Sequence, residues 1–232
     1  APDANFGLTG IGLNDDFLRG LAHRAPGVNL QQLAGFVVFG VIHSFGVFLK
    51  PLMRHFGSSS TATSAFYAIS SVSFYFLGPV TGRFGDRYGP QKAAALGAVL
   101  MGAGLVATSA IGDLWIGYLT YGAAVGAGAA CAYVPTFANL GGWFSKWRTT
   151  ALGIGAAGTG VGMLVVPPLA AALIESYGCR TAYVVLGIAS AILLGSSALV
   201  IRPPAQSKES VAARPLREAL RSREFRLLYV SW

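Results

Sequence analysis

Long apolar stretches separated by short polar connections dominate the chain. Six of them reach about 20 residues, the length that an α-helix needs to cross a hydrocarbon core of about 30 Å. They cover residues 32–53, 64–82, 92–111, 115–144, 149–177 and 181–201. The pattern predicts an all-α polytopic membrane protein with six transmembrane helices.

Composition favours a membrane protein over a water-soluble one. Of the 232 residues, 53% are hydrophobic and only 11% are charged, and the mean hydropathy is +0.57. Soluble domains carry about 25% charged residues. The composition therefore argues against a water-soluble fold.

Two polar ends flank the predicted six-helix domain over residues 32–201. Residues 1–31 are charged and lack an apolar core, so we interpret them as a cytoplasmic tail and not as a cleavable signal. Prolines and mixed charges predict a central cytoplasmic loop over 202–224, and a new apolar run predicts the start of a seventh helix over 225–232. We expect the chain to be the N-terminal half of a larger protein and to have no transport activity alone.

The basic residues indicate how the chain is oriented in the membrane. The chain has 17 Lys and Arg against 9 Asp and Glu, and all the basic ones except Lys50, Arg54 and Arg180 lie in the tail or in alternate connections. Basic connections face the cytoplasm. This predicts a multi-pass protein of the cell membrane with a cytoplasmic N-terminus, and the net charge of +8 gives no support to a nucleic-acid partner.

An internal match suggests a repeat. Residues 79–89 (PVTGRFGDRYG) match 168–178 (PLAAALIESYG) at a proline, an acidic residue, a tyrosine and a glycine. The two segments end the second and fifth predicted spans, on opposite faces of the membrane, as in an inverted three-plus-three repeat. Chance similarity remains the alternative, because Pro and Gly are common at helix ends.

The charged connection after the second span resembles a signature loop of the major facilitator superfamily. The stretch GRFGDRYGPQK matches that loop at Gly82, Asp86, Arg87 and Gly89, with Lys92 close by. The resemblance implies a cytoplasmic gate that latches two six-helix halves, the second half being a partner of this one. A plain topological anchor is the alternative interpretation.

Further segments resemble the monocarboxylate-transporter-like and oxalate/formate-antiporter-like branch of that superfamily. These are SFGVFLKPLMRHFG, ALGIGAAGTGVG with PPLAAALIESYGCRTAYVVLG, and LREALRSREFRLL. The resemblance implies secondary active transport of a small organic anion by proton symport or anion exchange. A drug or hydrophobic-solute exporter, and a non-transporting scaffold or receptor, remain alternatives.

His43 is the first candidate for the transport site. It falls in the middle of the first span, where an ionisable group is costly and is usually functional. A histidine can bind a proton and can then pair with an anion, so it offers a protonatable partner for both. By resemblance, it stands where animal relatives carry a lysine for the substrate carboxylate. The alternative is a neutral histidine bonded to a neighbouring helix.

Four other residues are weaker candidates for the substrate and proton site. Tyr75 offers a hydroxyl on the second span, or simply packs between helices. Tyr133 and Thr136 flank Pro135, which bends the fourth span. Arg148 begins the fifth span and either guides anions or anchors the helix.

Glycines four residues apart predict close helix packing in lipid. The pairs are Gly122–Gly126 and Gly158–Gly162.

The sequence contains no motif for a catalytic centre, a metal site or a cofactor, and only two cysteines, Cys131 and Cys179. The chain is therefore not expected to be part of an enzyme.

Overall fold

The computed structural model describes residues 15–143 and 148–200, and every element in these ranges is helical. The elements are α1 (Asp15–His43), α2 (Phe45–Phe56), α3 (Ser60–Tyr88), α4 (Pro90–Ser109), α5 (Leu114–Gly117), the π-helix η2 (Tyr118–Val125), α6 (Gly126–Trp143) and α7 (Arg148–Val200). The predicted central loop and seventh helix lie outside the described residues. Helix α1 begins well before the predicted first span, inside the segment interpreted as a tail.

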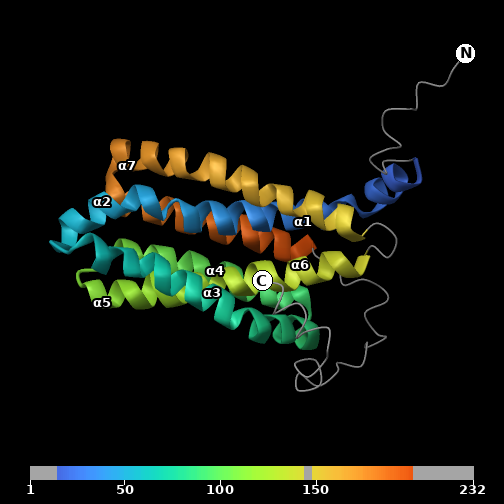
Figure 1. The fold of residues 1–232 in the computed structure, drawn as a ribbon, viewed down its shortest axis with the longest axis horizontal. Helices are drawn as coiled ribbons and strands as arrows, with labels where there is room; N and C mark the ends of the chain where they lie inside the picture. The colour runs from blue at the N-terminus through green and yellow to red at the C-terminus, as the bar shows by residue number, and fades with distance from the viewer. Residues whose placement is uncertain (1–14, 144–147, 201–232) are drawn as a thin grey trace, which may run out of the picture.

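These elements form six helical rods, which confirms the predicted fold class. Helices α1 and α2 continue each other and are interrupted only at Ser44, and α5, η2 and α6 form one further rod. Helix α7 is broken at Gly178, so that its two halves run antiparallel, as Figure 1 shows. Helices α3 and α4 complete the six.

Most of the bundle is long and apolar enough to cross a membrane. Among the described residues, four stretches meet this condition: Asn29–Phe56, Pro90–Ser109, Leu114–Leu140 and Leu152–Leu199. The last includes the reversal at Gly178 and therefore supplies two rods. Helix α3 has 29 residues, which is also enough length, but it is more polar.

Two glycines at matching places support the inverted repeat. Gly89 joins α3 to α4 with φ 92° and ψ 148°, and Gly178 joins the halves of α7 with φ 82° and ψ 165°. Both angles lie where a residue with a Cβ is strained, and both let one helix reverse into the next without a loop. The sequence match placed these glycines over each other, so the match reflects a shared backbone turn.

The predicted glycine pairs bring helix backbones together. A Cβ added to Gly158 or Gly162 would collide with the backbone of α1, at Gln32 and Phe36 respectively. A Cβ added to Gly126 would lie 2.5 Å from the Ser70 carbonyl oxygen of α3. Small residues thus allow the close approach that helix association in lipid requires.

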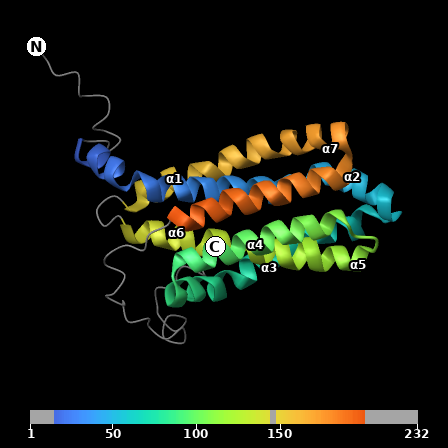
Figure 2. The same cartoon turned by 180° about the vertical axis from the view of Figure 1, so that it is seen from behind.

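The bundle presents two different faces. Helices α1 and α3 and the first half of α7 lie toward the viewer in Figure 1, whereas α4 and the second half of α7 cover the face in Figure 2. Between the faces lies an apolar core that includes Val38, Phe66, Met101, Leu105 and Val125, each fully buried.

Candidate functional site

His43 lies at the break between α1 and α2. It is the last residue of α1, and Ser44 separates it from the first residue of α2. The Ser44 hydroxyl donates to the Val41 carbonyl oxygen at 2.7 Å, a local side-chain bond of the kind that bends helices. Interrupted membrane helices are common at transporter binding sites. The histidine thus occupies the irregular point of its span.

The His43 ring is held by one hydrogen bond that defines its free nitrogen. Its Nδ1 lies 2.9 Å from the carbonyl oxygen of Phe39, and a carbonyl can only accept, so Nδ1 carries a proton. The other ring nitrogen, Nε2, has no hydrogen-bond partner within the described residues, and the side chain is exposed in this chain. Nε2 is therefore the atom that can meet a ligand.

Two aromatic rings contact this imidazole, and one of them links it to two further rings. Phe39 stacks on it with ring centroids 6.0 Å apart, and Tyr67 of α3 meets it edge-on at 6.2 Å. Phe39 in turn contacts Phe74 of α3 at 5.7 Å and Tyr133 of α6 at 4.9 Å. These five residues form what we call the His43 cluster. The cluster thus joins one polar imidazole to four aromatic rings.

The candidate tyrosines differ in their relation to this cluster. Tyr133 belongs to it and is half-buried. Tyr75 is 73% exposed, and its ring contacts Phe74 at 5.2 Å and makes no ring contact with His43. Tyr67 is the tyrosine beside His43. The sequence pattern did not single out this residue, although the seven-residue spacing of Tyr67 and Phe74 places both on one side of α3.

Thr136 and Arg148 are not brought to the cluster by any described contact. The Thr136 side chain is 4% exposed, and its hydroxyl donates to the Ala132 carbonyl oxygen of its own helix. Arg148 begins α7, and its side chain lies outside the described part of the chain.

The glycines of the signature loop serve a tight junction between α3 and α4. Gly89 is the single residue between the two helices, and its N–H donates to the Gly85 carbonyl oxygen at 2.9 Å. A Cβ at Gly85 would lie 2.6 Å from Pro135 of α6, whereas one at Gly82 would meet only Val134, at 3.8 Å. Gly85 and Gly89 are thus required by packing and by backbone angle, and Gly82 is not.

The charged side chains of this loop are exposed on the surface of the chain. Asp86, Arg87 and Lys92 are all exposed, and the Arg87 guanidinium carbon lies 5.4 Å from the centre of the Tyr88 ring. Within the described residues, the Asp86 carboxylate has neither a hydrogen bond nor an ion pair. An acceptor held free at the end of a rigid turn can bind amides or cations from another element.

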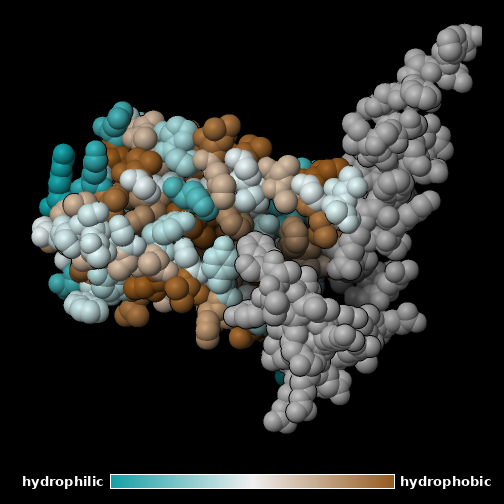
Figure 3. Space-filling view, in the orientation of Figure 1, coloured by the Kyte–Doolittle hydropathy of each residue, from teal (hydrophilic) through white to brown (hydrophobic). Residues whose placement is uncertain are grey.

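The residues of the His43 cluster come from α1, α3 and α6, and α1 and α3 belong to the face that Figure 1 shows. Gly35 and Gly40 of α1 lie against Thr159 and Val166 of α7, while the cluster rings join α1 to α3 and α6. Figure 3 shows teal and pale, polar to weakly polar residues along this face among brown apolar ones. Its polarity suits a surface that meets water or another helical unit better than one that meets lipid only.

The chain belongs to the major facilitator superfamily. The family model described as "Major Facilitator Superfamily" matches residues 33–232, which is most of the chain. The all-helical structure agrees with the N-terminal half of a major facilitator fold.

No group of three or more His, Cys, Asp or Glu suited to a metal ion occurs among the described residues. Membership in a transporter family agrees with the prediction that the chain is not part of an enzyme.

The chain is similar to several monocarboxylate transporters. It is 30% identical to monocarboxylate transporter 13 of Bos taurus over 179 residues, 77% of this chain and 42% of that protein. It is 30% identical to monocarboxylate transporter 4 of Rattus norvegicus over 186 residues, with shares of 78% and 39%. For monocarboxylate transporter 11 of Homo sapiens the identity is 28% over 181 residues, with shares of 75% and 38%. The matched part thus spans about two fifths of the length of these relatives.

Proposed function

We propose that the protein containing this chain is a secondary active transporter of small organic anions of the monocarboxylate type. The observation that carries the proposal is the bond from His43 Nδ1 to the Phe39 carbonyl oxygen, which leaves Nε2 of this exposed side chain without a partner among the described residues. The names of the similar proteins support the substrate class.

The hydrogen bond links proton binding to anion binding. Neutral His43 has its one proton on Nδ1, so Nε2 is an acceptor and repels a carboxylate. Protonated His43 carries a second N–H at Nε2 and a positive charge, and both favour a carboxylate. The anion therefore binds together with a proton. Tyr133, and Tyr75 on the exposed side of α3, supply additional hydroxyl groups for the same substrate, while Thr136 and Arg148 remain secondary candidates.

The Gly82–Lys92 loop acts as the cytoplasmic gate in this mechanism. Its exposed charges, Asp86, Arg87 and Lys92, bind a second six-helix half when the cytoplasmic side is closed and release it when that side opens. The glycine-packed contact between α1 and α7 lets the rods of this half move as one body. The anion is coupled to a proton by symport. Anion exchange is the variant in which the transporter returns to its starting conformation only with an anion bound.

The membrane orientation follows from the basic residues and gives a test of its own. With the N-terminus in the cytoplasm of a cell-membrane protein, the Gly178 turn faces outward. Cys179, which is partly exposed, should then react with a membrane-impermeant maleimide added outside intact cells, while the buried Cys131 should not. Labelling of Cys179 only after the membrane is opened would contradict this orientation.

The transport proposal is tested by uptake of a labelled monocarboxylate in cells that express the full-length protein. His43→Gln keeps a hydrogen-bonding side chain but cannot be charged, so we expect the apparent KM to rise about ten- to hundredfold, equivalent to the loss of a charged hydrogen bond of about 1.5–3 kcal/mol. Tyr75→Phe should raise it only about twofold to tenfold, as for a neutral bond.

A matched histidine variant and other solutes complete this experiment. His23→Gln alters a histidine that precedes the predicted first span, and it should leave uptake unchanged. Export of apolar dyes without monocarboxylate uptake would favour the drug-exporter alternative, and no transport of any solute would favour a scaffold or receptor. Equal uptake by His43→Gln and the unaltered protein would refute the role of His43.

A further inference from the structure

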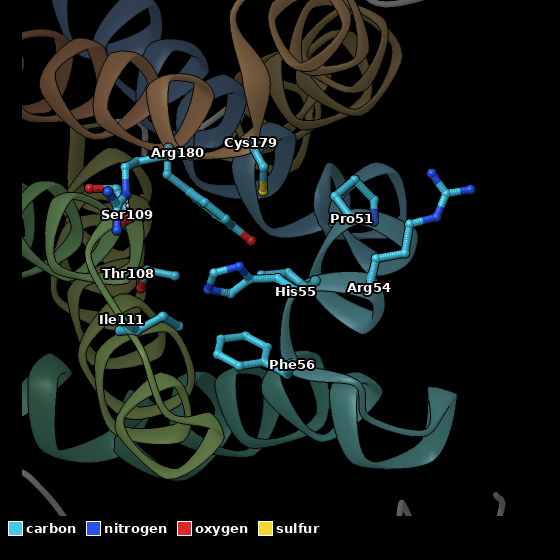
Figure 4. Close-up of a pocket in the computed structure, with 11 residues that line it drawn as sticks. Pro51, Arg54, His55, Phe56, Thr108, Ser109, Ile111, Cys179 and Arg180 are labelled. Atoms are coloured by element: carbon cyan, nitrogen blue, oxygen red, sulfur yellow. Dashed lines mark hydrogen bonds between the residues drawn. The ribbon is translucent and has the colours of Figure 1, made fainter.

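A second candidate site lies at the end of the bundle opposite the Gly82–Lys92 loop. The end of α2, the end of α4 and the beginning of the second half of α7 enclose a cavity of about 480 Å³, shown in Figure 4. We call it the α2–α4–α7 cavity. It is lined by Leu52, Thr108 and Ile111 and by the polar residues His55, Cys179, Arg180 and Tyr183, among others. The His43 cluster contributes none of its residues to it.

All the ionisable lining residues of this cavity that can carry a positive charge are basic side chains, and no carboxylate opposes them. None of its lining residues is acidic, and Arg180 has no ion pair within the described part of the chain. The Arg180 Nε donates to the Ser109 carbonyl oxygen at 2.8 Å, which satisfies one of the free carbonyls at the end of α4. That bond fixes the guanidinium beside the cavity and leaves its two terminal nitrogens as donors.

A buried hydroxyl without a partner points to a missing ligand. The Tyr183 side chain is only 2% exposed, and its hydroxyl has no hydrogen bond. The ring cannot easily turn away, because it stacks on Phe48 with centroids 4.0 Å apart. A buried polar group without a partner costs about 1–3 kcal/mol, and such groups are nearly always satisfied in folded proteins. The hydroxyl is therefore a donor without an acceptor among the described residues, in a side chain that lines the cavity.

Figure 4 shows which of the lining side chains extend into the cavity, although Arg54 also lines it. The His55 ring and the Cys179 sulfur extend into it, whereas the Arg54 side chain is directed away. The His55 ring is positioned by an edge-on contact with Phe56, with centroids 4.9 Å apart. The hydrogen-bond donors among the lining residues are thus the Arg180 guanidinium, the Tyr183 hydroxyl and the His55 imidazole.

We propose that the α2–α4–α7 cavity binds an oxyanion, the carboxylate of a small molecule or the phosphate of a lipid, through Arg180 and the Tyr183 hydroxyl. Guanidinium groups bind carboxylate and phosphate with charge-assisted, often bidentate hydrogen bonds. The cavity has room for a small molecule, and its position at the end of the rods gives access to solutes and to lipid headgroups alike. This site is separate from the proposed transport site and does not depend on it.

Cys179 provides a direct readout, because an occupied cavity shields its thiol. The full-length protein in nanodiscs of neutral lipid is treated with a small maleimide at constant pH and ionic strength, with chloride replaced stepwise by acetate or phosphate. The alkylation rate of the Cys179 peptide is followed by mass spectrometry, with the Cys131 peptide as a reference for a buried thiol. At an anion concentration ten times Kd, we expect about a tenfold slower rate.

A second arm uses nanodiscs that contain phosphatidylglycerol and no added oxyanion. Slowing in this arm identifies the lipid phosphate as the source, and slowing only with acetate or phosphate identifies a soluble anion. If the Cys179 rate is the same in chloride, in acetate, in phosphate and with phosphatidylglycerol, the proposal is overturned.

Variants show whether the protection comes from the assigned residues. Arg180→Gln should abolish it, and Arg54→Gln, which removes the same charge from a side chain directed away, should retain it. Tyr183→Phe keeps the stacked ring and loses only the hydroxyl, so it should weaken protection even if Arg180→Gln fails to fold. His43→Gln should leave protection unchanged while it impairs uptake. Equal protection in Tyr183→Phe and Arg54→Gln would contradict the assignment.

Discussion

The Nδ1 atom of His43 donates a hydrogen bond to the carbonyl oxygen of Phe39, one helical turn earlier, at 2.9 Å. This single bond sets both the tautomer and the direction of the ring. It means that a neutral His43 can only accept at Nε2, and that only the protonated ring can donate to an anion. The proposed link between proton and substrate thus follows from an arrangement within one helix.

Tyr67 should support His43 through its ring and not through its hydroxyl. The contact between them is edge-on, with centroids 6.2 Å apart, and no hydrogen bond joins the two side chains. Tyr67→Phe is therefore expected to keep the KM for a monocarboxylate, and Tyr67→Ala, which removes the ring, to raise it severalfold. Uptake kinetics of both variants decide the matter; a Tyr67→Phe defect as large as that of Tyr67→Ala would show that the hydroxyl is needed.

The sequence predicted more of the bundle than of the site. Apolar length alone predicted six spans, because the hydrocarbon thickness sets the length of a helix. The equivalence of Gly89 and Gly178 was also visible, since a turn without a loop requires glycine. Tyr67 was missed for the opposite reason. Every predicted span except the third contains aromatic residues, and which of them meets His43 depends on how α3 is rotated against α1.

Some local features had no signal in the sequence. The π-helix Tyr118–Val125 interrupts a rod whose sequence has the pattern of an ordinary apolar span. The α2–α4–α7 cavity is formed by residues far apart in the chain, so Arg180 appeared only as an exception to the distribution of basic residues.

The contact between α1 and α7 predicts contrasting effects at two neighbouring glycines. A Cβ at Gly158 would collide with the Gln32 backbone, whereas one at Gly160 would meet nothing within 4 Å. Gly158→Ala should therefore lower the free energy of unfolding by about 1–3 kcal/mol, as overpacking does. Gly160→Ala is the control and should not destabilise the protein. Thermal unfolding in detergent measures both, and equal loss of stability in the two variants would mean that the packing is different.

The junction between α3 and α4 predicts a similar contrast in the signature loop. Gly89 has φ 92°, where a side chain is strained, so Gly89→Ala should cost about 1–3 kcal/mol of stability. Gly82 lies in a helix with only an ordinary contact at 3.8 Å, so Gly82→Ala should be tolerated in both stability and uptake. A severe transport defect in Gly82→Ala with normal stability would show that Gly82 serves the gate through a contact that this half alone does not make.

The pH profile of His43→Lys tests the central claim most directly. Histidine changes its charge over roughly pH 5 to 8, whereas lysine stays protonated throughout that range. For the unaltered protein we predict that the KM for a monocarboxylate rises steeply as the pH is raised, because neutral His43 cannot donate from Nε2. For His43→Lys we predict a KM that stays low and nearly constant over the same range. If His43→Lys keeps the steep pH dependence of the unaltered protein, the proton that accompanies the anion is bound elsewhere, and His43 does not couple the proton to the substrate.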